Sequence, residues 1–132
     1  LQHLIKELQL EKNVKLLGYR SDIPSIEKSV DMFAFPSFRE GLPVSLMEAM
    51  ASGLPVIASK VRGNVDLVKN GTNGYLADPE DVLGWAEKIQ YLMKNNLERQ
   101  AMSRNNQKDM ANYDKKVVKK QLYSIYKEQG VF

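Results

Sequence analysis

The residues from Val30 to Ser59 constrain the fold more than any other part of the chain, because they indicate a strand, a loop, a helix and a second strand in succession. Asp31–Phe35 is a short apolar run that Pro36 ends, as expected of a buried strand. Pro55–Ala58 is a second run of this kind. Two strands joined through a helix predict a right-handed crossover and a parallel sheet, and therefore an α/β fold.

The helix between these strands is predicted over Val44–Ser52, and both of its ends carry a signal. Pro43 suits the first helical position, where its missing N–H removes no hydrogen bond. Gly53 suits the position after the helix, where the backbone takes a positive φ. One helical stripe carries the apolar side chains of Leu46, Met47, Met50 and Ala51.

The loop before this helix, Ser37–Leu42, indicates binding of an anion and of a diol. A helix N-terminus presents free N–H groups and the positive end of the helix dipole, which together favour a phosphate by about 0.3–1 kcal/mol. Gly41 has no Cβ, so a ligand can approach its backbone closely. Glu40 and Glu48, with seven residues between them, each carry a carboxylate that can accept two hydrogen bonds from a ribose or a sugar.

The same two glutamates have a simpler interpretation. Glu40 can stabilise the positive end of the helix without any ligand, and Glu48 can be a solvated surface residue. Their spacing alone favours this simpler interpretation, and the surrounding motifs change the balance.

Taken together, these motifs resemble those of retaining glycosyltransferases of the GT-B fold, glycosyltransferase family four, and most of all the branch that builds capsular and exopolysaccharides. The resemblance extends from about Val14 to Met93. It rests on motifs that follow one another in order: Phe35–Ser37, Glu40–Pro43, Glu48–Ala51, Gly53–Ser59, Arg62–Asn64, Asp66–Val68, Asn70–Gly71 and Asn73–Leu76.

The resemblance implies a role for each residue of the predicted donor site. Glu40 is the candidate catalytic residue: it accepts hydrogen bonds from the donor sugar and helps to hold the anomeric carbon, rather than acting as a covalent nucleophile. Glu48 accepts hydrogen bonds from the ribose. The backbone around Pro43 faces the sugar and the diphosphate through the N–H groups of Gly41, Leu42 and Val44.

The resemblance also implies a loop for the nucleotide base, at Tyr19 and Arg20. An ordinary turn is an equal alternative for these two side chains. No metal is expected, because the helix end and basic residues take that part and the sequence has no Asp-X-Asp pair. No other cofactor is expected, since the nucleotide sugar is a substrate.

Composition sets further limits on the chain of 132 residues. It has 43% hydrophobic and 27% charged residues, an ordinary composition for a globular protein, and its length is enough for one domain with a core. We expect no membrane span, no leader and no disulfide, and these features are compatible with the cytoplasm. The net charge of +3 fits an anionic small ligand or a membrane surface better than a nucleic acid.

The remaining elements are predicted from periodicity and capping signals. Strands are expected over Val14–Leu17 and Gly74–Ala77, and helices over Leu1–Leu10, Ile23–Ser29, Val65–Asn70 and Leu97–Tyr113. A further helix opens after Asp78 with Glu80 and Asp81 in its first turn, and its apolar face comprises Val82, Leu83, Ala86, Ile89, Leu92 and Met93. Trp85 is expected to pack in the core, and His3 to lie on the surface.

The final helix is predicted over Lys115–Gln129, with Asp114 as its cap. A basic amphipathic helix of this kind can lie on an anionic membrane, which would place the protein at the inner membrane face. The favoured alternative is a solvated basic face on a helix that packs against the sheet or a partner domain. The lysines in question are Lys115, Lys116, Lys119, Lys120 and Lys127.

The resemblance further implies that residues 1–132 are an incomplete C-terminal, nucleotide-sugar-binding domain with a Rossmann-like parallel sheet flanked by helices, and with terminal helices over about 97–129. Two strands and a basic pair that clamps the donor diphosphate would precede Leu1. Val14–Leu17 would then either pair directly with Asp31–Phe35, be completed by another chain, or belong to a piece of a larger protein; the last is favoured.

The function expected from the resemblance is transfer of a sugar, with retention, from a nucleotide sugar to a growing glycan or a lipid-linked acceptor. UDP is the favoured nucleotide, with GDP and ADP left open. The isolated chain is expected to be inactive, because the acceptor domain and the basic pair are missing. The alternative is a module that binds a nucleotide or phosphosugar without catalysis, or an inactive partner subunit.

Overall fold

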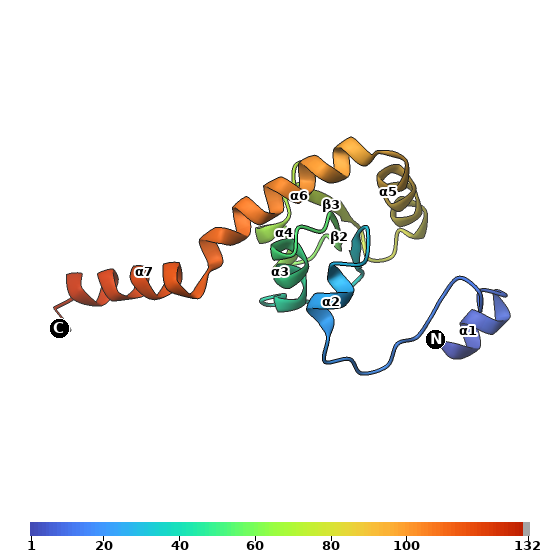
Figure 1. Cartoon of the computed structure of the whole chain (residues 1–132), viewed down its shortest axis with the longest axis horizontal. Coiled ribbons are helices and arrows are strands. Elements are labelled where there is room, and N and C mark those ends of the chain that lie inside the picture. The colour runs from blue at the N-terminus through green and yellow to red at the C-terminus, as the bar shows by residue number, and fades with distance from the viewer. Residues whose placement is uncertain (131–132) are drawn as a thin grey trace.

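Three parallel strands form the centre of the molecule, and the computed structural model describes residues 1–130 (Figure 1). The predicted limits of 1–132 therefore include two positions outside the described residues. The elements in chain order are α1 (Gln2–Glu7), α2 (Ile23–Glu27), β1 (Phe33–Phe35), α3 (Val44–Ala51), β2 (Val56–Ser59), α4 (Asn64–Leu67), β3 (Gly74–Ala77), α5 (Val82–Lys94), α6 (Asn96–Met110), the 3₁₀ turn η1 (Ala111–Tyr113) and α7 (Lys115–Glu128).

The strands lie in the order β1-β2-β3, and both pairs are parallel. Phe33 lies opposite Val56, and Val56 lies opposite Gly74. Each strand thus pairs with the next in sequence after a helical connection, through α3 and then α4. This arrangement confirms the predicted Rossmann-like parallel sheet, and β3 has the predicted bounds.

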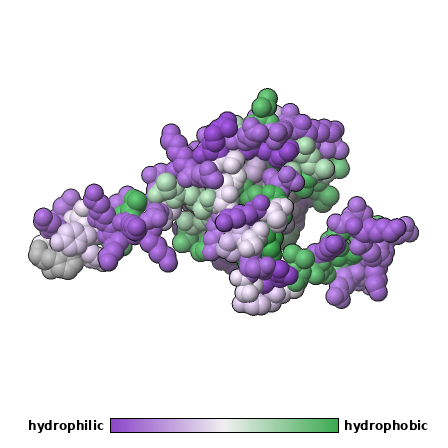
Figure 2. Space-filling view, in the orientation of Figure 1, coloured by the Kyte–Doolittle hydropathy of each residue, from purple (hydrophilic) through white to green (hydrophobic). Residues whose placement is uncertain are grey.

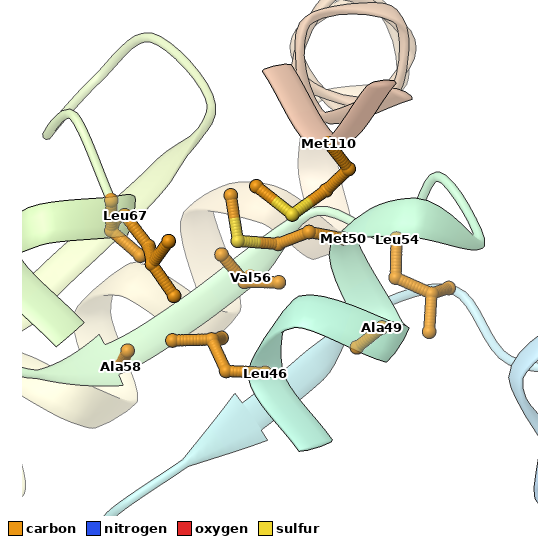
Figure 3. Close-up of a cluster of buried hydrophobic side chains, with 9 residues drawn as sticks. Leu46, Ala49, Met50, Leu54, Val56, Ala58, Leu67 and Met110 are labelled. Atoms are coloured by element: carbon orange, nitrogen blue, oxygen red, sulfur yellow. The ribbon is translucent and has the colours of Figure 1, made fainter. Parts of the chain in front are cut away.

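All four residues of β2 are buried, and they face two separate cores. Because side chains alternate along a strand, Val56 and Ala58 contribute to one core and Ile57 to the other. Figure 3 shows the first core, where α3 lies over β2 and Met110 of α6 approaches Met50. Its buried members are Leu46, Ala49, Met50, Leu54, Val56, Ala58, Leu67, Val68 and Met110.

The second core is formed between the sheet and α5. It comprises Ile57, Ala77, Trp85, Leu92 and Met102. The indole Nε1 of Trp85 donates to the carbonyl oxygen of Asp78 at 2.9 Å, so the ring is buried with its polar atom satisfied. The prediction that Trp85 packs in the core is confirmed.

The predicted apolar face of α5 was partly wrong. Val82 and Leu83 are each 76% exposed, and Met93 is 65% exposed. The helix begins at Val82 rather than directly after Asp78, since Asp81 is the N-cap and its Oδ1 accepts the Gly84 N–H at 2.9 Å. Near the start of the helix, the buried residues are Gly84 and Trp85 rather than Val82 and Leu83.

Other element limits shift by a few residues. In α3 the buried alanine is Ala49, whereas Ala51 is exposed. The helix α4 ends at Leu67 rather than Asn70, because Asn70 turns back toward the sheet and its side chain accepts the Leu76 N–H at 2.9 Å. Gly53 has φ +83°, as its predicted capping role requires.

The predicted strand at Val14–Leu17 was wrong. This segment is irregular, and Val14, Leu16 and Leu17 are 40–55% exposed. A strand needs a neighbour for its backbone groups, and β1 stays at the edge of the three-stranded sheet within the described residues. Direct pairing of Val14–Leu17 with β1 therefore does not occur.

Both ends of the chain extend away from the body in Figure 1. At the N-terminal end, α1 is shorter than the predicted Leu1–Leu10 and contains no buried residue. At the C-terminal end, α7 also buries none, although Asp114 caps it as predicted by accepting the Lys116 N–H at 2.7 Å. No helix within residues 1–130 is both long enough and apolar enough to cross a membrane.

Candidate functional site

Two of the predicted donor-site residues, Glu40 and Gly41, lie in the loop after β1, at the edge where open parallel sheets bind ligands. The loop after β1 leads to Glu40 and Gly41, and the loop after β2 leads to Arg62 and Gly63. Gly63 holds the two loops in contact. Its φ is +85°, and a Cβ there would lie 2.3 Å from the carbonyl oxygen of Gly41, so only glycine allows this packing.

A hollow of about 530 Å³ opens between these loops. We call it the Glu40 hollow; it is lined by Arg39, Glu40, Gly41 and Arg62. Glu40 is half-buried and both arginines are exposed. Within residues 1–130 none of these three charged side chains forms an ion pair. They are therefore free to contact a ligand.

The N-terminus of α3 follows the Glu40 loop in the chain, after Leu42 and Pro43, and it is uncapped. Pro43 occupies the N-cap position without a side-chain hydrogen bond, and the first turn holds no acidic residue. The Val44 N–H donates to the carbonyl oxygen of Leu42 at 3.0 Å. The first N–H groups of α3 without an acceptor among the described residues are thus those of Ser45 and Leu46.

This geometry changes the predicted set of donors in one respect. The prediction placed the N–H of Val44 toward the donor, and that group is already engaged within the turn. Ser45 and Leu46 were not in the predicted set. The signal that could have found them is the predicted helix start, since the first N–H groups of any helix have no intrahelical acceptor.

Glu48 lies in a different hollow from Glu40. This second hollow, of about 750 Å³, separates α3 from the start of α7, and we call it the α3–α7 groove. Its α3 side comprises Leu42, Val44, Met47, Glu48 and Ala51, and its other side Gln107, Met110, Ala111 and Tyr113–Lys116. Gly41 lines the Glu40 hollow, whereas Leu42 and Val44 line the α3–α7 groove, so the turn of residues 41–44 contributes to both hollows.

The predicted base loop is not brought to these hollows. Tyr19 is 96% exposed, and the side chain of Arg20 is held by Asp22. The guanidinium donates from Nε and Nη2 to the two carboxylate oxygens at 2.8 and 2.6 Å. This pair lowers the pKa of the Asp22 carboxyl. Neither Tyr19 nor Arg20 lines the Glu40 hollow or the α3–α7 groove.

A buried residue, Asn64, holds the loop after β2, and this structural role was not predicted from the sequence. Asn64 is fully buried, and its Nδ2 donates to the carbonyl oxygen of Ser59 at 3.0 Å. This bond ties the start of α4 to the end of β2 and so fixes Arg62 and Gly63 between them.

Within residues 1–130, no three His, Cys, Asp or Glu side chains are grouped closely enough to hold a metal ion. A metal-free site remains a prediction. The chemistry on offer is recognition of an anion by backbone N–H groups and guanidiniums, beside carboxylates that accept hydroxyl protons.

Two curated proteins with related sequences extend well beyond this chain. The UDP-Gal:alpha-D-GlcNAc-diphosphoundecaprenol alpha-1,3-galactosyltransferase of Escherichia coli is 45% identical over 76 residues, which are 58% of this chain and 20% of that protein. The capsular polysaccharide biosynthesis glycosyltransferase CapM of Staphylococcus aureus is 33% identical over 115 residues, 86% of this chain and 30% of that protein. The chain thus spans about a fifth to a third of the length of these relatives.

Solved structures show the same fold. Anabaena HepE in complex with UDP has a TM-score of 0.91 and 29% identity, over 96% of this chain and 35% of that one. The C-terminal domain of a group 1 glycosyl transferase, LpcC of Francisella tularensis, has a TM-score of 0.73 and 25% identity, over 84% of this chain and 58% of that one. The three-stranded sheet is therefore part of a larger domain.

The model of one protein family matches residues 1–109, which is most of the chain. That family is described as Glycosyl transferases group 1, and its fold agrees with the parallel sheet and its flanking helices. The chain belongs to the group 1 glycosyl transferases, as part of the C-terminal domain of the GT-B fold.

Proposed function

We propose that this chain forms the donor-binding part of a retaining glycosyltransferase that takes its sugar from a nucleotide sugar, with UDP as the favoured nucleotide. The observation that carries the proposal is the uncapped N-terminus of α3, whose Ser45 and Leu46 N–H groups have no acceptor within residues 1–130. This helix end follows Glu40, which forms no ion pair within the same residues. An anion at this helix end gains the dipole and two N–H donors. The UDP in the HepE complex supports the choice of nucleotide.

In the proposed reaction, the bond between the anomeric carbon and the diphosphate breaks, and the diphosphate keeps the electron pair. A bond to an acceptor hydroxyl forms, and the proton of that hydroxyl passes to the leaving diphosphate. The helix end stabilises the charge that develops on the leaving diphosphate. Glu40 accepts hydrogen bonds from the sugar hydroxyls and orients the anomeric carbon. Glu48 holds the ribose from the α3–α7 groove.

The acceptor is proposed to be a growing glycan or a lipid-linked saccharide of polysaccharide biosynthesis. The names of the two relatives support this, since one acts on a diphosphoundecaprenol-linked sugar and the other in capsule biosynthesis. The greater length of these relatives leaves room for an N-terminal domain that binds the acceptor. Residues 1–130 hold no second ligand-binding domain, so we expect no transfer by the chain alone.

The exposed apolar face of α7 fits a partner domain better than a membrane. The sequence favoured a helix that packs either against the sheet or against a partner domain. Because α7 buries no residue, it does not pack against the sheet, and we propose the partner domain. Peripheral contact with anionic lipid is the alternative, supported by the five lysines of residues 115–127.

The test is a calorimetric titration of the chain with UDP, GDP and ADP, repeated on Glu48→Ala. Charged hydrogen bonds to a ribose are worth about 1.5–3 kcal/mol, so we expect the variant to lose about ten- to a hundredfold in affinity. Glu87→Ala, which removes an exposed carboxylate from α5, is the matched control and should leave affinity unchanged.

Binding of one nucleotide that depends on Glu48 supports the donor site and identifies the base. Binding that ignores the Glu48 substitution indicates a generic anion site at the helix end. It would favour the second candidate, a module that binds phosphates without catalysis. Absence of all nucleotide binding counts against the proposal.

A further inference from the structure

Two arginines from different loops lie on the same hollow. Arg39 comes from the loop after β1 and Arg62 from the loop after β2, and both line the Glu40 hollow. They are 23 positions apart in sequence, so the parallel sheet and the loop packing bring them together.

These two guanidiniums are not used to hold the fold. Arg20 elsewhere is paired with Asp22, and Arg99 donates to the carbonyl oxygens of Leu92 and Met93. By contrast, no hydrogen bond or ion pair within residues 1–130 involves Arg39 or Arg62. Even Glu40, which lines the same hollow, does not form an ion pair with them.

Two contacts hold the backbone next to Arg62, and one of them reaches the loop of Arg39. Gly63, next to Arg62, packs its Cα against the carbonyl oxygen of Gly41, two residues from Arg39. Asn64 anchors the same loop to Ser59. The hollow therefore keeps two positive charges beside one negative charge, and its net charge of +1 favours an anion. A guanidinium also matches a carboxylate or phosphate through paired N–H donors.

We propose that Arg39 and Arg62 form a subsite for an anionic group of the substrate next to the donor sugar, distinct from the α3 N-terminus that takes the donor diphosphate. This inference rests on the proposed function and specifies its substrate class. The anion has two sources: a carboxylate on the donor sugar, as in a hexuronic acid, or the diphosphate of a lipid-linked acceptor. In either case Glu40 accepts hydroxyl groups while the arginines select the charge.

The donor arm of the test compares UDP-glucuronic acid with UDP-glucose by calorimetry. The readout is the ratio of the two affinities, because a general change in nucleotide binding cancels from it. We expect the chain to prefer the uronic acid by about tenfold, and the double variant Arg39→Gln/Arg62→Gln to lose that preference.

The acceptor arm compares farnesyl diphosphate with farnesyl monophosphate in the presence of UDP. Both probes carry the same apolar chain, so the ratio reports on recognition of the diphosphate. The double variant should reduce this ratio by about tenfold if the acceptor is the source. Arg104→Gln, which removes an exposed arginine of α6 away from the hollow, is the matched control for both arms.

A Glu40→Gln variant gives a readout of opposite sign. It removes the negative charge from the hollow and should raise the preference for the anionic ligand. If Glu40 had only a structural role, the variant would leave that preference unchanged. Its fold is checked by the melting temperature.

A change in the donor arm assigns the subsite to the sugar, and a change in the acceptor arm assigns it to the acceptor. No change of either ratio in the double variant contradicts the subsite, whether or not UDP binds. If the unmodified chain does not bind UDP, the proposed function itself fails. That outcome is distinct from unchanged ratios in the double variant, which contradict the subsite.

Discussion

The consecutive helices α6 and α7 are almost equal in length, with 15 and 14 residues, yet they behave in opposite ways. The sequence of α6 is polar, and the helix nevertheless buries Met102, Asn106 and Met110. The sequence of α7 is amphipathic, and the helix buries nothing. Figure 2 shows α7 as a mainly hydrophilic arm that stands clear of the body.

The difference lies in what each helix meets. α6 runs past both cores, with Met102 in one and Met110 in the other. Between them, Asn106 donates through Nδ2 to the carbonyl oxygens of Leu54 and Asn73 at 2.7 and 2.8 Å. α7 leaves the body after η1, and Val118, Leu122 and Ile125 remain 38–53% exposed. An apolar stripe thus shows that a helix can pack, and the neighbouring surface decides whether it does.

The largest test of this comparison is a pair of truncations, Met102→Ala in α6 and Leu122→Ala in α7. Removing a buried methionine side chain costs about 2–5 kcal/mol in the free energy of unfolding, since transfer and cavity terms add. Replacing the exposed Leu122, in a helix without buried residues, should lower the free energy of unfolding by less than about 0.5 kcal/mol. Urea unfolding measures both, and equal losses would show that α7 packs on the body in solution.

The second test concerns the polar contact that anchors α6. Asn106→Ala leaves two buried carbonyl oxygens without a donor, and we expect a loss of about 2–3 kcal/mol. The loss is limited because the Asn106 Oδ1 is itself buried without a partner. Asn105→Ala, which removes an exposed bond from Nδ2 to the Thr72 carbonyl oxygen at 2.7 Å, is the control and should cost less than about 1 kcal/mol.

A third, smaller effect follows from the contact of α6 with β3. Burial, with Glu98 of α6 as the next cause, raises the pKa of Tyr75 to about 12. An unfolded tyrosine ionises near pH 10, so the folded state binds the proton more tightly. The contribution is complete below pH 10 and falls away as the pH rises toward 12.

Unfolding measured between pH 9 and pH 12 tests this dependence. Tyr75→Phe should make stability less sensitive to alkali across this range, because the ionisation that favours the unfolded chain is removed. Glu98→Gln should shift the tyrosinate absorbance of the folded chain to lower pH. An unchanged titration in Glu98→Gln would mean that α6 does not act on Tyr75.

The smallest expected effect is that of removing α7 altogether. A stop codon at Lys115 should change the melting temperature of the body by no more than about 2 °C, since the helix buries no residue. In the full chain, amide exchange should be fast in α7 and slow in α6, because a 14-residue helix without packing is marginal in water. Strong protection of α7 would reveal a contact with the body.

Predictions from the sequence were reliable where the residue that carries the signal and the backbone that it affects lie in the same segment. Gly53 adopts the predicted positive φ, Asp114 caps α7, and β3 has the predicted limits. The strand at Val14–Leu17 failed, since its apolar residues indicated burial but no strand pairs with their backbone groups within residues 1–130. The α5 stripe failed because Gly84 and Trp85, rather than Val82 and Leu83, are buried near the start of the helix.

The candidate site divides in the same way. Its motifs identified the loop of Glu40 and the helix of Glu48 without any coordinates. They could not show that the Val44 N–H is engaged by Leu42, or that Glu40 and Glu48 line separate hollows. They also gave no reason to join Arg39 to Arg62, whose proximity depends on Gly63 packing against Gly41.

The sequence by itself determined the order of elements from β1 to α7, the parallel sheet, the family and the segment that carries the candidate site. These depend on periodicity, capping and turn chemistry, which act over a few residues. Only the tertiary structure decided which helix is buried, which N–H groups are free and which arginines meet. Those outcomes depend on contacts between segments far apart in the chain, and a polar helix such as α6 becomes part of the core because two apolar surfaces already flank it.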